Sequence, residues 1–285
     1  MKEHHGVEVN TSSVRRIAEQ HASRAGDIEG LPTRKQESKQ MIAEMDGEMV
    51  PLVEYTDSKD RRKTKKNHWA ELRIGTAQNF GEASWKYACS FKNADHLGNR
   101  LKEVMLRLGL TEQTKVHGVG DGALWIVEQG EKIAGQNYQH LIDLYHLCDY
   151  FAGAVIAWEE KTRQEVERLK HLAEEGEIGK ILKELKERQK IHPNHEGIKK
   201  CVQYIENRSG EFKYKEAKQM GLPLGSGKVE SSHRSLMQKR LKKPGTWWLR
   251  EKAADMANLR TLRANGGWKL LWQQDLIITS VLMAA

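Results

Sequence analysis

The chain has 285 residues, of which 38% are hydrophobic and 30% charged, and its formal net charge is +8. This apolar content excludes a wholly disordered chain, and the basic balance favours a polyanionic partner such as nucleic acid. Three scattered cysteines exclude a disulfide framework and a cysteine zinc site, and no apolar stretch is long enough to cross a bilayer, so we expect a cytoplasmic protein without a membrane partner.

The first predicted element is a helix over residues 7–22, with a start signal at Asn10 to Ser13. Val14 and Ile17 share one face of it, whereas Arg15 and Arg16 lie on another. This pattern fits the second half of a helix-turn-helix and an ordinary amphipathic helix equally well. Residues 26–39 are polar and are expected to form a linker.

Strand patterns follow. Residues 41–54 are apolar except at Asp46-Gly47, where we expect either a continuing strand or a hairpin turn. Alternation predicts further strands over residues 68–78 and 84–90, an apolar run predicts one over 115–127, and residues 57–66 read as a solvated basic loop. Helical periodicity marks residues 93–108, and residues 140–147 indicate a strand that passes into a helix. This order predicts an α/β fold with a mixed sheet and helices on its faces.

The second half of the chain is predicted to be helical. Residues 151–208 are rich in Ala, then in Glu and Lys, and His192-Pro193 breaks them. Ser226 is a candidate N-cap for a helix that continues to Leu241 and is stopped by Pro244-Gly245. A further helix is expected to run through Arg263.

Three acids stand at positions that suit metal chemistry. Asp46 interrupts an apolar strand, Asp121 lies between two glycines on the fourth strand, and Glu230 falls in the first turn of the late helix. Carboxylates are the ligands that hard divalent cations prefer, and flanking glycines let a phosphate backbone approach. Taken singly, the two aspartates also fit turn dipeptides, and the glutamate fits a helix cap.

Asp143 and His146 form a further pair at the expected strand-to-helix junction. Three residues apart, they are able to point into one cleft. The alternative is that Asp143 caps the helix and that His146 is a hydrogen-bonded histidine near the core.

Taken together, the motifs of this chain resemble a DDE transposase of the ISKra-type bacterial insertion sequences. The resemblance covers residues 6–272, and its most specific part is the block from Gly225 to Trp248. It is carried by Glu44-Met45-Asp46-Gly47, Gly120-Asp121-Gly122-Ala123, Asp143-Leu144-Tyr145-His146, Gly225-Ser226-Gly227-Lys228-Val229-Glu230-Ser231-Ser232 and Gln238 to Trp248.

The resemblance implies a ribonuclease-H-like catalytic domain with an α-helical insertion before the last catalytic acid. It divides the chain into a remnant of an N-terminal DNA-binding region (1–25), the first part of the catalytic domain (40–150), the insertion (151–220), the remaining catalytic part (221–275) and an unmatched tail (276–285). Asp46, Asp121 and Glu230 match the catalytic, metal-binding triad, and Asp143 and His146 match an accompanying Asp-x-x-His signature.

The expected activity is metal-dependent cleavage at transposon ends followed by strand transfer into target DNA, by a dimer on DNA in the nucleoid. The expected cofactor is Mg²⁺ or Mn²⁺, two ions per site. A nuclease of the same fold and a non-catalytic DNA-binding protein are the alternatives. Contacts to DNA are expected from Lys228, Arg234, Lys239, Arg240, Lys242, Lys243, Trp247 and Trp248, with a tryptophan stacking on an unpaired base at the cut end or simply packing in the fold.

Overall fold

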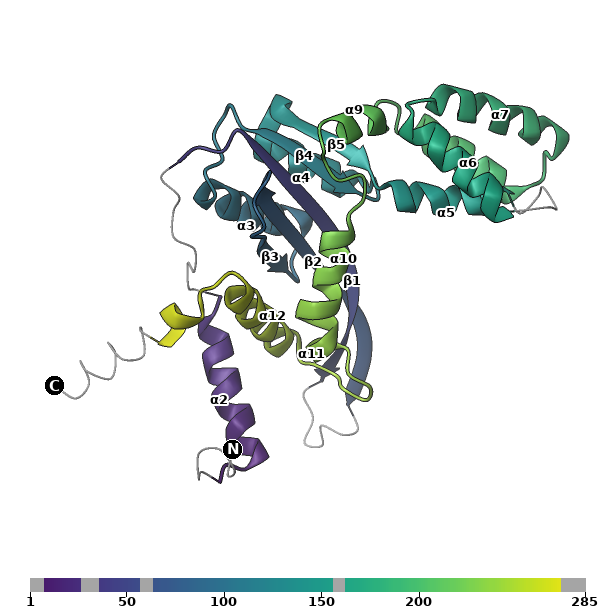
Figure 1. The fold of residues 1–285 in the computed structure, drawn as a ribbon. Helices are drawn as coiled ribbons and strands as arrows, with labels where there is room; N and C mark the ends of the chain where they lie inside the picture. Colours follow the sequence, from purple (N-terminus) through teal and green to yellow (C-terminus); the bar gives the residue numbers. More distant parts are fainter. Residues whose placement is uncertain (1–7, 27–35, 57–63, 156–161, 273–285) are drawn as a thin grey trace.

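The computed structural model describes residues 8–26, 36–56, 64–155 and 162–272 (Figure 1). In these residues one mixed sheet has the strand order β3-β2-β1-β4-β5. β1 pairs antiparallel with β2 and parallel with β4, β2 and β3 are antiparallel, and β4 and β5 are parallel. The strands are β1 (Gln40–Tyr55), β2 (Lys65–Asn79), β3 (Lys86–Ser90), β4 (Lys115–Gly120) and β5 (Tyr138–Ile142).

Helices cover the sheet and extend beyond it. They are α2 (Thr11–Arg24), α3 (Ala94–Arg107), α4 (Leu124–Ala134), α5 (Leu144–Val155), α6 (Thr162–Glu174), α7 (Ile178–Ile191), α8 (Glu196–Glu206), α9 (Tyr214–Gln219), α10 (Gly227–Ser232), α11 (Lys239–Leu241) and α12 (Arg250–Ala264), with the 3₁₀ turn η1 (Gly135–Asn137) and the π-helical turn η3 (His233–Gln238). The predicted mixed α/β architecture is confirmed.

β1 is a single unbroken strand. Asp46 pairs with Ile74 and Gly47 with Arg73 on β2, so the chain passes through this dipeptide without a turn. The carboxylate end of the Glu71 side chain on β2 lies over Gly47, in the space that a side chain at this position would take. The prediction of a continuing strand is therefore confirmed, and the hairpin alternative is wrong.

The expected strand over residues 115–127 is only half correct. β4 ends at Gly120, and Leu124–Ala134 is the helix α4. Gly122 takes a φ of 77°, a left-handed conformation that ends the strand and redirects the chain. Asp121 consequently lies just after β4 rather than on it.

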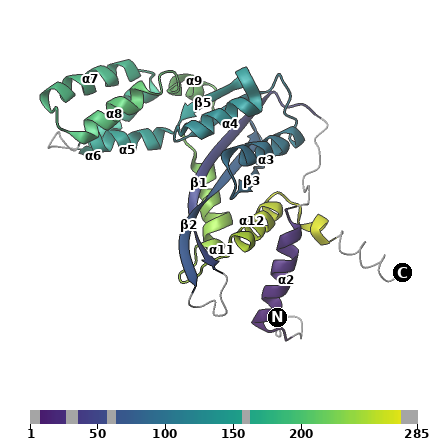
Figure 2. The ribbon, with the colours of Figure 1, turned by 180° about the vertical axis from the view of Figure 1, so that it is seen from behind.

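The two faces of the sheet carry different cores. α3 and α4 lie on one face, where Met41, Met45, Leu97 and Leu101 belong to one buried cluster. The segment from α10 to α12 lies on the other face, where Leu52 packs with residues such as Val229 and Met237 of that segment. Figures 1 and 2 show these two layers from opposite sides.

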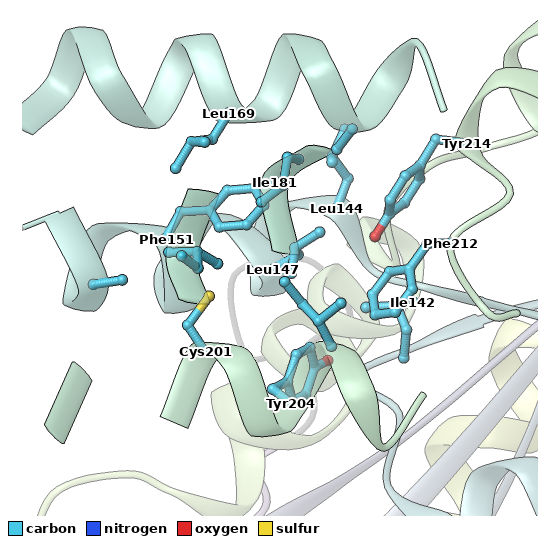
Figure 3. Packing of buried hydrophobic residues seen from close by; sticks show 14 of the residues in the cluster. Ile142, Leu144, Leu147, Phe151, Leu169, Ile181, Cys201, Tyr204, Phe212 and Tyr214 are labelled. Atoms are coloured by element: carbon cyan, nitrogen blue, oxygen red, sulfur yellow. The ribbon is translucent and has the colours of Figure 1, made fainter. Parts of the chain in front are cut away.

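The helices α5–α9 pack together at one end of the sheet and share their core with β1 and β5. α5 through α9 enclose a cluster that includes Phe151, Leu169, Ile181 and Cys201 (Figure 3). The expected break at His192-Pro193 is present, because α7 ends at Ile191 and α8 begins at Glu196.

α2 lies at the opposite end and packs against α12 (Figure 1). The predicted start signal is confirmed, since the Asn10 side chain accepts a hydrogen bond from the Ser13 N–H at 2.7 Å. No helix in the described residues is long and apolar enough to span a bilayer. Most of the expected linker and basic loop, and the whole of the 276–285 tail, lie outside the described residues.

Candidate active site

Continuing the register of three neighbouring parallel strands past its last pairs lines up three aspartates. Glu44 on β1 is opposite Val119 on β4, so the same register continued by two residues places Asp46 opposite Asp121. Gly120 is opposite Ile142, so Asp121 is in turn opposite Asp143. The carboxyl ends of β4 and β5 therefore bring Asp121 and Asp143 to the flank of Asp46.

Alternate residues of β1 present carboxylates to the helical segment α10-η3-α11. Glu44, Asp46 and Glu48 share one face because side chains two apart on a strand point the same way. The Glu44 carboxylate accepts the Val229 N–H at 2.7 Å, and Glu48 accepts from the Gln238 amide at 2.6 Å. The segment is thus bound along its length to one row of acids.

His233 lies between two of these acids. Its Nε2 is 3.3 Å from Asp46 Oδ2, and its Nδ1 is 3.2 Å from Glu48 Oε2. Burial lowers the pKa of His233, but the two carboxylates outweigh burial and raise it to about 9. Burial likewise raises the pKa of Glu48, whereas His233, Lys242 and Gln238 outweigh it and lower it to about 2. At neutral pH the result is a charged, buried ion pair.

The chain between Ser226 and Leu241 is helical, as predicted, but its middle is wound as the π-helical turn η3. A π turn shifts the side chains that follow it around the helix axis. Here it begins at His233 and ends at Gln238, two of the residues that meet the acids of β1.

Asp143 connects the end of β5 to the start of α10. Its Oδ1 accepts the Tyr145 and His146 N–H groups, as a helix cap does, at 2.7 and 3.1 Å. Its Oδ2 accepts both the Ser226 N–H and hydroxyl, at 2.6 and 2.5 Å. Ser226 is the N-cap residue of α10, as predicted, but its hydroxyl does not bond to the helix because it donates to the buried Asp143 instead.

Glu44 binds the backbone three residues after Ser226, at Val229. It is 2% exposed, and burial raises its pKa to about 7, against the stabilising Val229 N–H. The loop approaches closely: a Cβ at Gly225 would come within 2.8 Å of the Tyr145 ring. Two buried carboxylates, Glu44 and Asp143, thus hold the start of α10, the helix that carries Glu230.

Glu230 is exposed on α10 and is influenced by the acids of the sheet. Its pKa is raised, first by burial and then by the like charges of Asp143 and Asp46, while His146 and Arg234 oppose the rise. Asp46, Asp143 and His146 are thus near enough to Glu230 to act on its pKa.

Asp121 is held by its own turn. Its Oδ1 accepts the Ala123 N–H at 2.9 Å, and its backbone carbonyl accepts the Tyr204 hydroxyl at 2.8 Å. His146 has Tyr150 and Tyr204 as ring neighbours, with centroids 5.7 and 6.2 Å away. Tyr204 on α8 therefore brings the helical insertion into contact with both Asp121 and His146.

The expected divalent cations fit this cluster by the chemistry of the donors, since carboxylate oxygens suit Mg²⁺ and Mn²⁺ and the like charges at Glu230 favour a cation. The spacing is looser: within the described ranges no three His, Cys, Asp or Glu side chains are close enough to enclose a metal ion. Asp46 is engaged with His233, so ligation by Asp46 requires its side chain to turn away from that imidazole.

The residues expected to bind DNA divide into three groups. Arg234, Lys239 and Lys243 are exposed. Lys228 lies over the Trp85 and Tyr87 rings, and Lys242 is 2.8 Å from Glu48 Oε1, so both have partners within the fold. The remaining three, Arg240, Trp247 and Trp248, line a separate cleft.

Glu44, Glu48 and His233 were missed by the sequence reading. The signal for the acids was present as the alternation Glu44-Met45-Asp46-Gly47-Glu48, in which every second residue is acidic. No comparable signal marks His233, whose partners lie on a strand far away in the chain.

Most of the chain matches the model of a protein family. The chain matches, over residues 23–273, the model of a family described as an uncharacterised protein family, UPF0236. No curated protein matches it at a significant level.

Proposed function

The chain belongs to UPF0236, known as a transposase-associated family, and from this premise we propose that it is a DDE-type DNA transposase. In this proposal it cleaves DNA at transposon ends in a metal-dependent reaction and transfers the strand to target DNA. Asp46, Asp121 and Glu230 are the proposed catalytic acids.

The topology supports this proposal. Three antiparallel strands are followed by two parallel ones in the order β3-β2-β1-β4-β5, the arrangement expected of a ribonuclease-H-like domain. The helices α5–α9 stand between β5 and Glu230, where the resemblance expects an insertion. Because many activities share one fold, the argument for function rests on the site.

The observation that carries the proposal is the convergence of acids from distant parts of the chain. The strand register aligns Asp46, Asp121 and Asp143, and the like charges of Asp46 and Asp143 raise the pKa of Glu230, which arrives on a separate helix. A fold that gathers repelling carboxylates loses free energy unless a cation or a proton compensates them.

Asp46, Asp121 and Glu230 would hold Mg²⁺ or Mn²⁺, which supplies activation of the attacking oxygen and stabilisation of the leaving oxygen. Glu44 and Asp143 would position the loop that carries Glu230, through Val229 and Ser226. His146 would face a phosphate beside the acids, since it follows Asp143 at the start of α5 and its N–H is bonded to the Asp143 carboxylate.

The exposed cations Arg234 and Lys239 follow Glu230 on the same helical segment, and Lys243 lies just after its end. They would contact phosphates of the bound duplex, which contributes affinity without sequence preference. That affinity is expected to fall steeply as salt rises.

The test is cleavage of a labelled duplex that carries the inverted repeat flanking the coding sequence, with Mg²⁺ or Mn²⁺ and, in parallel, with EDTA. We expect cleavage with metal and joining of the freed 3′ end to a supercoiled plasmid. Asp46→Ala, Asp121→Ala and Glu230→Ala are each expected to lower cleavage by at least a hundredfold, as removal of a group essential in the transition state does.

Glu128→Ala is the matched control, because this acid is exposed on α4 outside the cluster. Thermal unfolding of all four variants separates lost chemistry from lost structure. Cleavage without joining would identify a nuclease, and binding of DNA without cleavage under either metal would identify a non-catalytic DNA-binding protein. Full activity in the Glu230 variant would remove this residue from the triad.

A further inference from the structure

A second cleft lies at the far end of β1, away from the acids. It has a volume of about 720 Å³, a size typical of small-ligand pockets, and α2, the end of β1, the 245–249 loop and α12 form its walls. The loop is tied to the strand by backbone hydrogen bonds, since Val53 N–H donates to the Trp248 carbonyl at 2.8 Å. This loop is therefore fixed to the sheet by its backbone.

Two indole rings define this cleft. Trp247 stands edge-on to Trp69, with ring centroids 6.2 Å apart. Trp248 packs against the core cluster of β1 and α12, and its indole N–H is buried without a hydrogen-bond partner in the described residues.

Cations accompany the rings. The Lys65 ammonium lies 5.9 Å from the centre of the Trp247 ring, and the Arg240 guanidinium lies 5.7 Å from that of Trp248. The charged side chains that line the cleft are Arg15, Glu19, Lys65, Arg240 and Lys252. Glu19 is ion-paired with Arg15 at 2.7 Å, so the balance in the cleft is positive.

The position of the cleft excludes the cut end of the DNA as its ligand. Leu52 forms a bridge with Trp248 and stands six residues along β1 from Asp46. Six residues of strand span about 20 Å, so a nucleotide in the cleft is several nucleotides away from a phosphate held at the acids. The expectation that a tryptophan stacks on the base at the cut end does not fit this distance.

We propose that this cleft binds unpaired nucleotides of single-stranded DNA, at a site separate from the acid cluster. The Trp247 ring, which belongs to none of the buried clusters, offers a face on which a base stacks, and the surrounding cations pair with the adjoining phosphates. Duplex DNA does not offer such base faces, because they are covered by neighbouring pairs. The choice of DNA rests on the proposed function; the contacts rest on the cleft alone.

The test is binding of a fluorescein-labelled twelve-nucleotide oligo(dT) to the full chain, measured by anisotropy in EDTA so that no metal-dependent chemistry contributes. Trp247→Ala is expected to weaken binding roughly tenfold, the usual effect of removing one stacking platform. Arg240→Ala is expected to weaken it and to reduce its salt dependence. Binding of a blunt duplex of the same length should change less than twofold in the Trp247 variant.

Trp268→Ala is the matched control, since Trp268 also has an arginine over its ring, Arg263 at 5.4 Å, but lies outside the cleft. Photo-crosslinking of an oligonucleotide that contains 4-thiothymidine should label the peptide with Trp247 and Trp248. Equal loss of oligo(dT) binding in the Trp247 and Trp268 variants, or crosslinks confined to other peptides, would overturn the proposal.

The two proposals fail separately. Oligo(dT) binding that depends on Trp247, in a chain that does not cleave DNA with any metal, would leave the cleft assignment standing and remove the transposase. Metal-dependent cleavage with oligo(dT) binding unaffected by Trp247→Ala would do the reverse.

Discussion

On one face of β1, Met41, Ala43 and Met45 pack against α3 and α4, whereas on the other Glu44, Asp46 and Glu48 meet the segment α10-η3-α11. Both rows belong to the same strand and alternate residue by residue. The apolar row is held by dispersion and exclusion of water, which depend on volume rather than on direction. The acidic row is held by hydrogen bonds and ion pairs, each with a particular partner.

This difference determines which substitutions each row of β1 tolerates. In the apolar row a residue of similar volume serves nearly as well. In the acidic row the loss of one partner leaves a charge buried and unpaired. We therefore expect substitutions in the acidic row to change stability through the charge and hydrogen-bonding groups that they remove. Substitutions in the apolar row are expected to change stability through side-chain volume.

The largest effect is expected from His233→Ala, which removes the imidazole between Asp46 and Glu48. Breaking a buried ion pair by deleting one partner costs about 3–5 kcal/mol. Urea unfolding at pH 7 measures this loss. Adding Glu48→Gln to the His233 variant should restore part of it, because the buried charge is then also removed; no recovery would mean that packing and not charge dominates here.

Met45→Ala is the matched change on the other face. Met45 is 2% exposed, and its truncation is expected to cost about 3 kcal/mol through the cavity it leaves. Met45→Leu, which preserves volume, should cost less than about 1.5 kcal/mol in the same urea titration. A leucine variant as unstable as the alanine variant would show that this face is not tolerant of shape.

A pH titration sharpens the comparison, because the apolar face holds one buried histidine, His140, 2.9 Å from the Tyr138 hydroxyl. Burial, with the charges of His117 and Arg208, lowers the pKa of His140 to about 4. The neutral ring is thus favoured in the folded chain, so its stability is complete above pH 6.5 and is lost as pH falls towards 4. The loss is on the order of 2–3 kcal/mol.

His140→Gln should flatten the stability curve between pH 6.5 and 4 relative to the parent chain. The carboxylate of Glu211 is 3.8 Å from His140 Nε2, and burial raises the pKa of that carboxyl, so it takes up protons earlier than an ordinary glutamate. A variant whose stability falls as steeply as that of the parent would place the sensitive group elsewhere.

The smallest effect is expected from Ser226→Ala, which deletes one of the two bonds from the loop to Asp143 and leaves the backbone N–H in place. The expected cost is about 1–2 kcal/mol. A double-mutant cycle with Asp143→Asn, followed by thermal unfolding, measures the coupling. Additive losses would show that the hydroxyl does not contribute through Asp143.

Periodicity predicted most of the architecture because the apolar rows of the strands and of α3 are long. It failed at α4, where Leu124 to Val127 is a short apolar run that fits a strand and a helix equally. The deciding feature was the turn at Gly122, whose left-handed conformation depends on the backbone and not on the apolar pattern.

The site was harder to predict than the fold. Glu44 owes its role to the Val229 N–H, which lies 185 positions later in the chain, and His233 to two acids on β1. Such partners are set by how a late helix approaches the sheet, and local pattern carries no information on that approach. Ser226 illustrates the same limit: its hydroxyl is suited to accept a hydrogen bond as a helix cap, but it donates one to a buried carboxylate nearby.

The bonds around Asp143 also bear on how the insertion is attached. The chain leaves the sheet at Leu144, whose N–H donates to the Leu224 carbonyl at 2.9 Å, and it returns through Ser226 on Asp143. The segments of chain that enter and leave the helices α5–α9 are therefore bonded to each other at one place. Because the two ends of this excursion are fixed to each other, while α8 also reaches the sheet through Tyr204, changes of length are expected to be tolerated best in α6 and α7, which lie between these attachments.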